Sequence, residues 1–171
     1  MEKLDEEIII EEKPIPLYKV VNAGGGIDLC IEGVILEIRK DSGIIFRCPK
    51  CNRRIKNGIC EEDGNVEGMP DLRIRALVDD GTGAVDVILN RELSEKLLKK
   101  TLEEYMNIAK EAMDYGIVYE EILDKLIAKP IRIKGDSIQS DFIVTIFAKS
   151  AEFISIDENK EADEILMQLE G

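Results

Sequence analysis

Three of the four cysteines of this chain lie in one short stretch, CPKCNRRIKNGICEEDG, residues 48–64. Cys48 and Cys51 are separated by two residues, and Cys60 and Asp63 have the same separation. A CxxC turn brings two sulfurs to one ion, and a second turn of equal spacing supplies the other two ligands of a tetrahedral site. The spacing therefore predicts a structural zinc ion (Zn2+) held by Cys48, Cys51, Cys60 and Asp63. We call residues 48–64 the zinc ribbon.

The same stretch of sequence also permits other interpretations. A thioredoxin-type redox pair needs CxxC at the start of a helix in a βαβ unit, and no such unit surrounds Cys48 and Cys51. A loop that has lost its metal remains open, as does a site completed by water or by Glu62. A 17-residue loop cannot build a hydrophobic core of its own, so we expect the ribbon to be disordered without metal.

The net charge of −13 is distributed unevenly along the chain. Residues 1–12 and residues 157–171 each carry −5, which leaves about −3 for the body between them. Within the body, residues 39–56 hold seven cations against one acid and surround the first cysteines. The acidic total therefore does not exclude a nucleic-acid partner, because the basic residues gather in one place.

Composition and missing motifs limit the class of protein. With 171 residues and 44% apolar content, the chain has material for one folded domain. It has no apolar run long enough to span a membrane and no signal peptide, so we expect a cytoplasmic protein with no membrane partner. Histidine, GxSxG, a phosphate-binding loop and HExxH are all missing from the sequence, so we expect no enzymatic activity.

The N-terminal half of the body reads mainly as strands. Residues 14–27 form a lead-in that ends in a glycine turn, and DLCIEGVILEIR, residues 28–39, predicts a bent strand with Gly33 as a candidate bulge. Cys30 lies inside this strand and is expected to be a buried core thiol. After the ribbon, DLRIRALV and AVDVIL flank the turn DDGTG and predict a hairpin whose first strand has one apolar face.

Beyond the hairpin the periodicity changes from two to between three and four. Residues 91–114 predict an amphipathic helix, and residues 117–128 a second, short one. Two further strands follow, PIRIKGD and DFIVTIFAKSAEFI. The order predicts a mainly β fold with helices, a five-stranded OB fold closed into a β-barrel, with the zinc ribbon between strands 1 and 2 and a helix between strands 3 and 4. Local patterns alone leave other α+β arrangements open.

The expected domain organisation follows from these elements. An acidic N-terminal tail covers residues 1–13, the OB fold covers residues 14–156 with a helical insert at residues 91–128, and an acidic C-terminal tail covers residues 157–171.

One combination of motifs resembles a known family. CPKC, eight residues, CEEDG, a strand, DDGTG, a strand, a helix and a strand ending in Gly135 resemble the zinc-containing OB domain of the replication protein A family, especially its archaeal single-stranded-DNA-binding members. The resemblance covers residues 28–156. It implies a single-stranded DNA binding module or small subunit that acts in DNA replication, repair or recombination. In that family a histidine usually precedes the glycine, where this chain has Asp63.

Proteins that bind single strands combine cations for the phosphates with aromatic side chains on which bases stack. The predicted phosphate contacts are Lys50, Arg53, Arg54, Arg73 and Arg75. The predicted stacking residues are Phe46 and Phe142, whereas Phe147 and Phe153 are assigned to the core. Because aromatic residues are few, we expect weak affinity that falls steeply with salt.

A second hypothesis is an assembly subunit that works mainly through protein–protein contacts with other replication protein A-like subunits. The acidic tails, the apolar stripe of the long helix and the shortage of aromatic residues motivate it. The tails themselves either compete with DNA for the basic groove or only keep the protein soluble.

Overall fold

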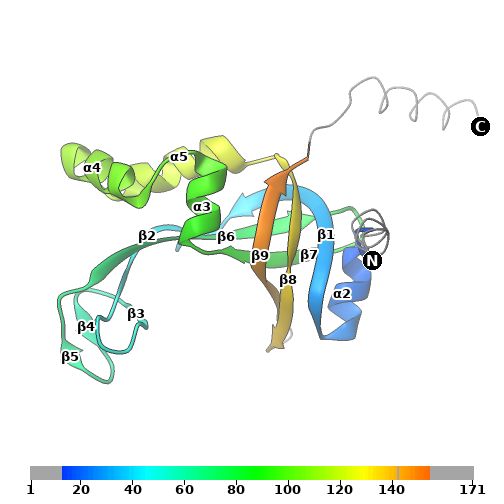
Figure 1. The fold of residues 1–171 in the computed structure, drawn as a ribbon, viewed down its shortest axis with the longest axis horizontal. Coiled ribbons are helices and arrows are strands. Elements are labelled where there is room, and N and C mark those ends of the chain that lie inside the picture. The colour runs from blue at the N-terminus through cyan, green and yellow to red at the C-terminus, as the bar shows by residue number, and fades with distance from the viewer. Residues whose placement is uncertain (1–12, 142, 155–171) are drawn as a thin grey trace, which may run out of the picture.

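The structure is a computed structural model that describes residues 13–141 and 143–154 (Figure 1). The predicted acidic tails, residues 1–13 and 157–171, lie outside the described residues except for Lys13. Within the described residues, no helix has the length and apolar character needed to cross a membrane.

Five long strands pair with one another in a closed ring. They are β1 (Gly25–Ile38), β6 (Met69–Asp79), β7 (Ala84–Leu89), β8 (Pro130–Ser140) and β9 (Ile143–Phe153). The hydrogen-bonded order is β1-β8-β9-β7-β6, and β6 pairs again with β1. The β7–β9 pair is parallel and the other pairs of the ring are antiparallel. The molecule is mainly β with a few helices, as the sequence predicts.

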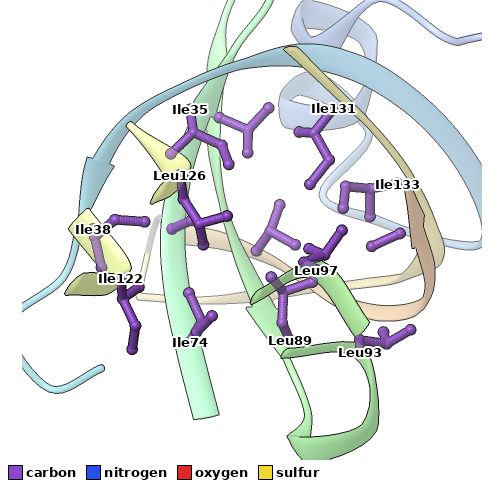
Figure 2. Packing of buried hydrophobic residues seen from close by; sticks show 14 of the residues in the cluster. Ile35, Ile38, Ile74, Leu89, Leu93, Leu97, Ile122, Leu126, Ile131 and Ile133 are labelled. Atoms are coloured by element: carbon purple, nitrogen blue, oxygen red, sulfur yellow. The ribbon is translucent and has the colours of Figure 1, made fainter. Parts of the chain in front are cut away.

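The core lies inside this ring because apolar residues alternate along its strands. On β6, Leu72, Ile74, Ala76 and Val78 are buried, and the residues between them face outward, as predicted. Figure 2 shows side chains from several strands and helices meeting in the interior. The labelled residues are Ile35, Ile38, Ile74, Leu89, Leu93, Leu97, Ile122, Leu126, Ile131 and Ile133.

Among the described residues, four helices cover the ring. They are α2 (Leu17–Ala23), α3 (Arg91–Leu98), α4 (Leu102–Ala112) and α5 (Gly116–Leu126). The first packs against β1 and β7, α3 packs against β6, β7 and β9, and α5 packs against β1 and β2 (Gly43–Arg47). In Figure 1, α2 lies on one side of the strands and the other three lie on the opposite side.

The predicted long helix over residues 91–114 is two helices, α3 and α4. Lys99 adopts a left-handed conformation with φ of 57°, which ends the first helix. Thr101 caps the second helix, because its side chain accepts a hydrogen bond from the Glu104 backbone N–H at 3.2 Å. Glu95 bridges the break by accepting the Leu102 backbone N–H at 2.6 Å. Apolar periodicity continues across this turn, which is why it alone did not reveal the break.

The lead-in predicted for residues 14–27 contains a helix, α2. Its first residue, Leu17, donates its backbone N–H to Asp80 Oδ2 at 2.9 Å, and the helix ends at Gly24 with φ of 73°. Leu17 and Val20 are buried in the core, so a short helix with few local signals is stabilised by tertiary packing.

The predicted bulge at Gly33 is wrong. Gly33 pairs regularly with Ile131, and the register shifts of β1 lie between Gly26 and Leu29 and between Ile35 and Glu37. A Cβ at Gly33 would lie 2.7 Å from Val78 Cγ1, so the glycine allows a close approach of β6. Cys30, on the same strand, is buried as predicted.

Candidate nucleic-acid interface and metal site

The ribbon is an arm of short strands between β1 and β6. It is entered through β2 (Gly43–Arg47) and contains β3 (Arg54–Ile55), β4 (Ile59–Cys60) and β5 (Gly64–Asn65). Because β2 pairs with β6 and β3 pairs with β2, the arm continues the sheet outward from the ring. Figure 1 shows it projecting away from the helices and the ring.

The four predicted metal ligands come together at the base of two turns. One ligand atom from each of Cys48, Cys51, Cys60 and Asp63 lies within 4.8 Å of all the others. Asp63 Oδ2 is 3.2 Å from Cys48 Sγ and 3.5 Å from Cys60 Sγ, and the Sγ atoms of Cys51 and Cys60 are 3.5 Å apart. A tetrahedral zinc site with Zn–S bonds of about 2.3 Å has sulfur–sulfur edges of about 3.8 Å. The donor set and its spacing thus fit a tetrahedral ion.

The electrostatics favour the anionic form of two of these groups, Cys60 and Asp63. For the Cys51 thiol, the backbone N–H of Arg53 lowers the pKa, but burial and hydrogen bonds with the neighbouring ligand side chains outweigh it and raise the pKa to about 11. The backbone N–H groups of Asp63 and Glu62 lower the pKa of the Cys60 thiol. A hydrogen bond from the Cys48 thiol lowers the pKa of Asp63. The carboxylate of Glu62 instead forms an ion pair with Arg53 at 3.1 Å. Asp63, and not Glu62, therefore belongs to the cluster of possible ligands.

A second, small hydrophobic cluster lies beside this group. Its buried members are Cys48, Ile55 and Cys60, and Phe46 packs against them. The ring of Phe46 also contacts that of Tyr115 edge-on, with centroids 5.8 Å apart. Phe46 is thus half-buried between the ribbon and Tyr115, and its role in base stacking stays a prediction.

Most of the predicted phosphate-binding arginines already have acidic partners. Arg73 donates to Asp41 Oδ2 at 2.9 Å, Arg54 lies 3.4 Å from the same oxygen, and Arg75 is bound to Asp86 at 2.9 Å. Burial lowers the pKa of Arg73, whose side chain is only 19% exposed. Arg54 and Arg73 thus share Asp41, whereas Arg75 is bound to a different acid, Asp86.

Two further arginines, which sequence reasoning missed, are also bound to acidic side chains. Arg39 donates to Asp86 Oδ1 through Nε at 3.2 Å and Nη2 at 3.0 Å, and Arg47 donates to Asp71 Oδ2 at 2.6 Å. Asp86 therefore joins Arg39 and Arg75, which lie far apart in sequence. The available signal was strand alternation, since Asp86 stands between two inward-facing valines and must face outward.

Two of the remaining predicted residues lie on the exposed surface of the ribbon. Lys50 is exposed next to the first pair of cysteines, and Arg53 is exposed with Glu62 as its partner. Phe142 lies outside the described residues.

An exposed aromatic residue does occur on the strands, at a position that was assigned to the core. Phe147 is 45% exposed because Val144 and Ile146 face inward and Phe147 follows on the outer face of β9. It is paired with Ile88 of β7, and Ile88 is paired with Arg75 of β6. A cation, an apolar side chain and an aromatic ring thus form one row across three strands. Phe153, also assigned to the core, is 41% exposed.

Comparison with known proteins identifies relatives of similar sequence and similar fold. A protein from Methanothermobacter thermautotrophicus named replication factor A is 27% identical over 115 residues, which is 64% of this chain and 14% of that protein. A solved replication protein A heterotrimer bound to ssDNA matches with a TM-score of 0.58 and 13% identity, over 91% of this chain and 39% of that one. The chain has the OB fold of replication protein A. The predicted resemblance is confirmed.

Two further findings complete the comparison. The structure of yeast RPA bound to ssDNA matches this OB fold with a TM-score of 0.51 and 14% identity, over 85% of this chain and 86% of that one. No family model matches the chain.

The position of the outer row can be compared with the surface that other OB folds use. OB folds bind oligonucleotides on the face of strands 2 and 3, flanked by the loops after strands 1 and 4. In this OB fold those strands are β6 and β7, the ribbon lies in the first loop, and the β8–β9 turn is the second. The row from Arg75 through Ile88 to Phe147 lies on β6, β7 and the adjoining β9.

Proposed function

We propose that the ring of strands is a closed OB barrel, spanning residues 14–156, that binds single-stranded DNA. The observation that carries the proposal is the row of Arg75, Ile88 and Phe147 on the face that OB folds use. Phe147 supplies a flat surface for one base, and Arg75, held by Asp86, supplies a cation beside it. Similarity to replication protein A, which its solved structures show bound to ssDNA, supports this assignment.

The charges on this face predict modest affinity. Asp41, Asp71 and Asp86 accept hydrogen bonds from arginine N–H groups that would otherwise donate to phosphates. The freer cations are on the ribbon, where Lys50 and Arg53 are exposed. We therefore assign phosphate contacts chiefly to the ribbon and base stacking to the strands.

Titration of a fluorescent oligo-dT by anisotropy, with a duplex of equal length as competitor, tests the proposal. We expect the single strand to bind more tightly than the duplex. Loss of one stacked base costs about 1–3 kcal/mol, so Phe147→Ala is expected to weaken oligo-dT binding roughly 5- to 150-fold. Phe153→Ala is the matched control, because Phe153 is also on β9 and similarly exposed but lies at its far end.

Two results would count against this function. No binding of oligo-dT at low salt would remove it entirely. Equal losses for Phe147→Ala and Phe153→Ala would show that the assigned face is wrong, since only Phe147 lies in the row with Arg75 and Ile88.

We also propose that the ribbon binds one zinc ion through Cys48, Cys51, Cys60 and Asp63. The converging ligand atoms and the N–H groups directed at Cys60 support this assignment. Bound zinc supplies a rigid crosslink between the two turns of the ribbon. The chain's residues then present Lys50 and Arg53 in fixed positions.

Chelator competition on purified protein tests the fourth ligand. Asp63→Ala should weaken zinc binding by more than the roughly 10- to 100-fold typical of lost outer-sphere partners. Glu62→Ala, which removes the neighbouring carboxylate, should leave zinc binding unchanged. The reverse result would assign Glu62 as the ligand.

Other replication protein A-like subunits are the protein partners that we propose. The chain spans 14% of its curated relative and 39% of a chain from a structure described as a heterotrimer. Light scattering alone and with candidate subunits measures this association, and a constant monomer mass in every mixture would argue against it.

A further inference from the structure

A mostly apolar groove lies between α3, α5 and the end of β9, away from the ribbon. It has a volume of about 580 Å³. Leu97 and Leu98 contribute from α3, Pro130 begins β8, and Phe153 and Ile154 contribute from the end of β9. Phe153 remains 41% exposed there, so the groove leaves a large aromatic side chain in water.

The charges around the groove are all of one sign. Lys99, Lys125 and Lys129 line it, and no acidic residue does. Lys125 donates to the backbone carbonyl of Leu98 at 2.9 Å and lies 3.9 Å from Glu121. Within residues 13–141 and 143–154, Lys99 and Lys129 form no ion pair, in contrast to the arginines of the outer row. The groove therefore suits an occupant that is apolar on one face and acidic on the other.

Residues 155–171 of the chain have this chemistry. They follow directly from Ile154, which lines the groove, and they carry six acids and one lysine. Ala162, Ile165, Leu166 and Leu169 recur at the spacing of one face of an amphipathic helix. The seven residues between Ile154 and Ala162 can span about 23 Å when extended, which is enough to turn back to the groove.

We propose that this groove binds the chain's own residues 162–169 as an amphipathic helix, with the acidic residues of the segment facing Lys99 and Lys129. A tethered segment acts at an effective concentration in the millimolar range, so it outcompetes a free segment of equal affinity. The acidic segment is then held at the far end of β9 from the β8–β9 turn that flanks the nucleic-acid face. The inference does not depend on DNA binding.

Hydrogen exchange of the zinc-loaded, full-length protein tests this docking. The reporters are the backbone N–H groups of Lys99, Ile127 and Lys129, which border the groove. Leu166→Gln with Leu169→Gln removes the apolar face of the segment, and Lys99→Glu with Lys129→Glu reverses the charge of the groove. We expect each pair to speed exchange of the reporters about tenfold and to lower Tm on the order of 2–4 °C.

Combining the two pairs gives the decisive comparison. If the segment occupies the groove, the four-residue variant shows little more effect than either pair, because both remove the same interaction. Lys56→Glu with Lys110→Glu has the same charge change away from the groove and should leave the reporters unchanged. Additive effects, or unchanged exchange in the Leu166→Gln and Leu169→Gln variant, would overturn the proposal. Dependence of exchange on protein concentration, with a doubled mass, would assign the groove to a second copy.

Discussion

The ring of strands and the zinc ribbon are stabilised by different means. The core cluster of the ring draws side chains from all five long strands and from four helices. The cluster of the ribbon has three buried side chains, Cys48, Ile55 and Cys60, and two of these are predicted metal ligands. The ring therefore has a core that is independent of metal, whereas the ribbon uses the same side chains for packing and for coordination.

Because of this difference, we expect the ring and the ribbon to unfold separately. Loss of a large core side chain lowers the stability of the whole ring, because its strands share one interior. Loss of a ligand removes the interaction that holds the two turns of the ribbon, and little apolar burial remains to replace it. If the two regions unfold independently, a substitution in one should leave the stability of the other unchanged.

Removal of the metal is expected to have the largest effect. Structural zinc sites contribute about 10–16 kcal/mol of binding free energy, which in such peptides is folding free energy. Cys60→Ser, or chelation, should abolish stoichiometric zinc and expose the backbone N–H groups of residues 48–66 to exchange. The N–H groups of β7 and of residues 74–79 of β6 should keep their protection, since these residues pair with one another in the ring, whereas residues 69–73 of β6 pair with β2.

Cys30→Ser is the matched control for this experiment. Cys30 is also buried, but it lies on β1 and outside the ligand cluster. It should retain one zinc per chain while it lowers the stability of the ring. If Cys60→Ser unfolded the ring as completely as the ribbon, the two regions would be one cooperative unit.

Truncation of a core side chain tests whether damage to the ring leaves the ribbon and its zinc site intact. Ile74 is fully buried on β6, so Ile74→Ala should lower the free energy of unfolding of the ring by about 2–5 kcal/mol. Zinc content in the remaining folded protein should not change. Ile59→Ala, in the ribbon and 57% exposed, should change stability by no more than about 0.5 kcal/mol. Denaturant unfolding, followed by metal analysis at low denaturant, measures both.

Local sequence patterns were sufficient to predict the structure where the spacing of residues repeats. Two-residue alternation predicted which residues of β6 face the core, and the matched spacing of the cysteines and Asp63 predicted which ligand atoms converge. The helix α2 and the break at Lys99 could not be predicted in this way, because Asp80 and Glu95 fix them through contacts that periodicity does not show.

The nucleic-acid face was harder to predict for a similar reason. Phe147 and Phe153 are exposed although both were assigned to the core, since exposure depends on which neighbours cover a side chain. For Phe147 the alternation of β9 carried the information, and residue type alone suggested the core. For the arginines, the alternation of β7 places Asp86 on the outer face, but it does not show that Arg39, 47 residues away, reaches the same carboxylate as Arg75.

A substitution at the junction between the ring and the ribbon should have the smallest effect on stability. It should also show where the boundary between the two regions lies. Arg47, at the end of β2, bonds to Asp71 of β6 at 2.6 Å and donates to the Asn52 carbonyl in the first turn of the ribbon at 3.3 Å. Asp71→Asn keeps the shape of the side chain but removes its charge. Because the pair is partly exposed, we expect a loss of about 0.5–1 kcal/mol.

The location of that loss decides how the ribbon is attached. Glu62→Gln, which breaks the more exposed pair with Arg53, is the matched control and should have no measurable effect. If Asp71→Asn speeds hydrogen exchange in residues 48–54 but leaves the exchange rate in β7 unchanged, then Arg47 only orients the ribbon. If exchange rises equally in β7, then the ion pair stabilises the ring itself, and the boundary between the regions lies beyond Arg47, inside the ribbon.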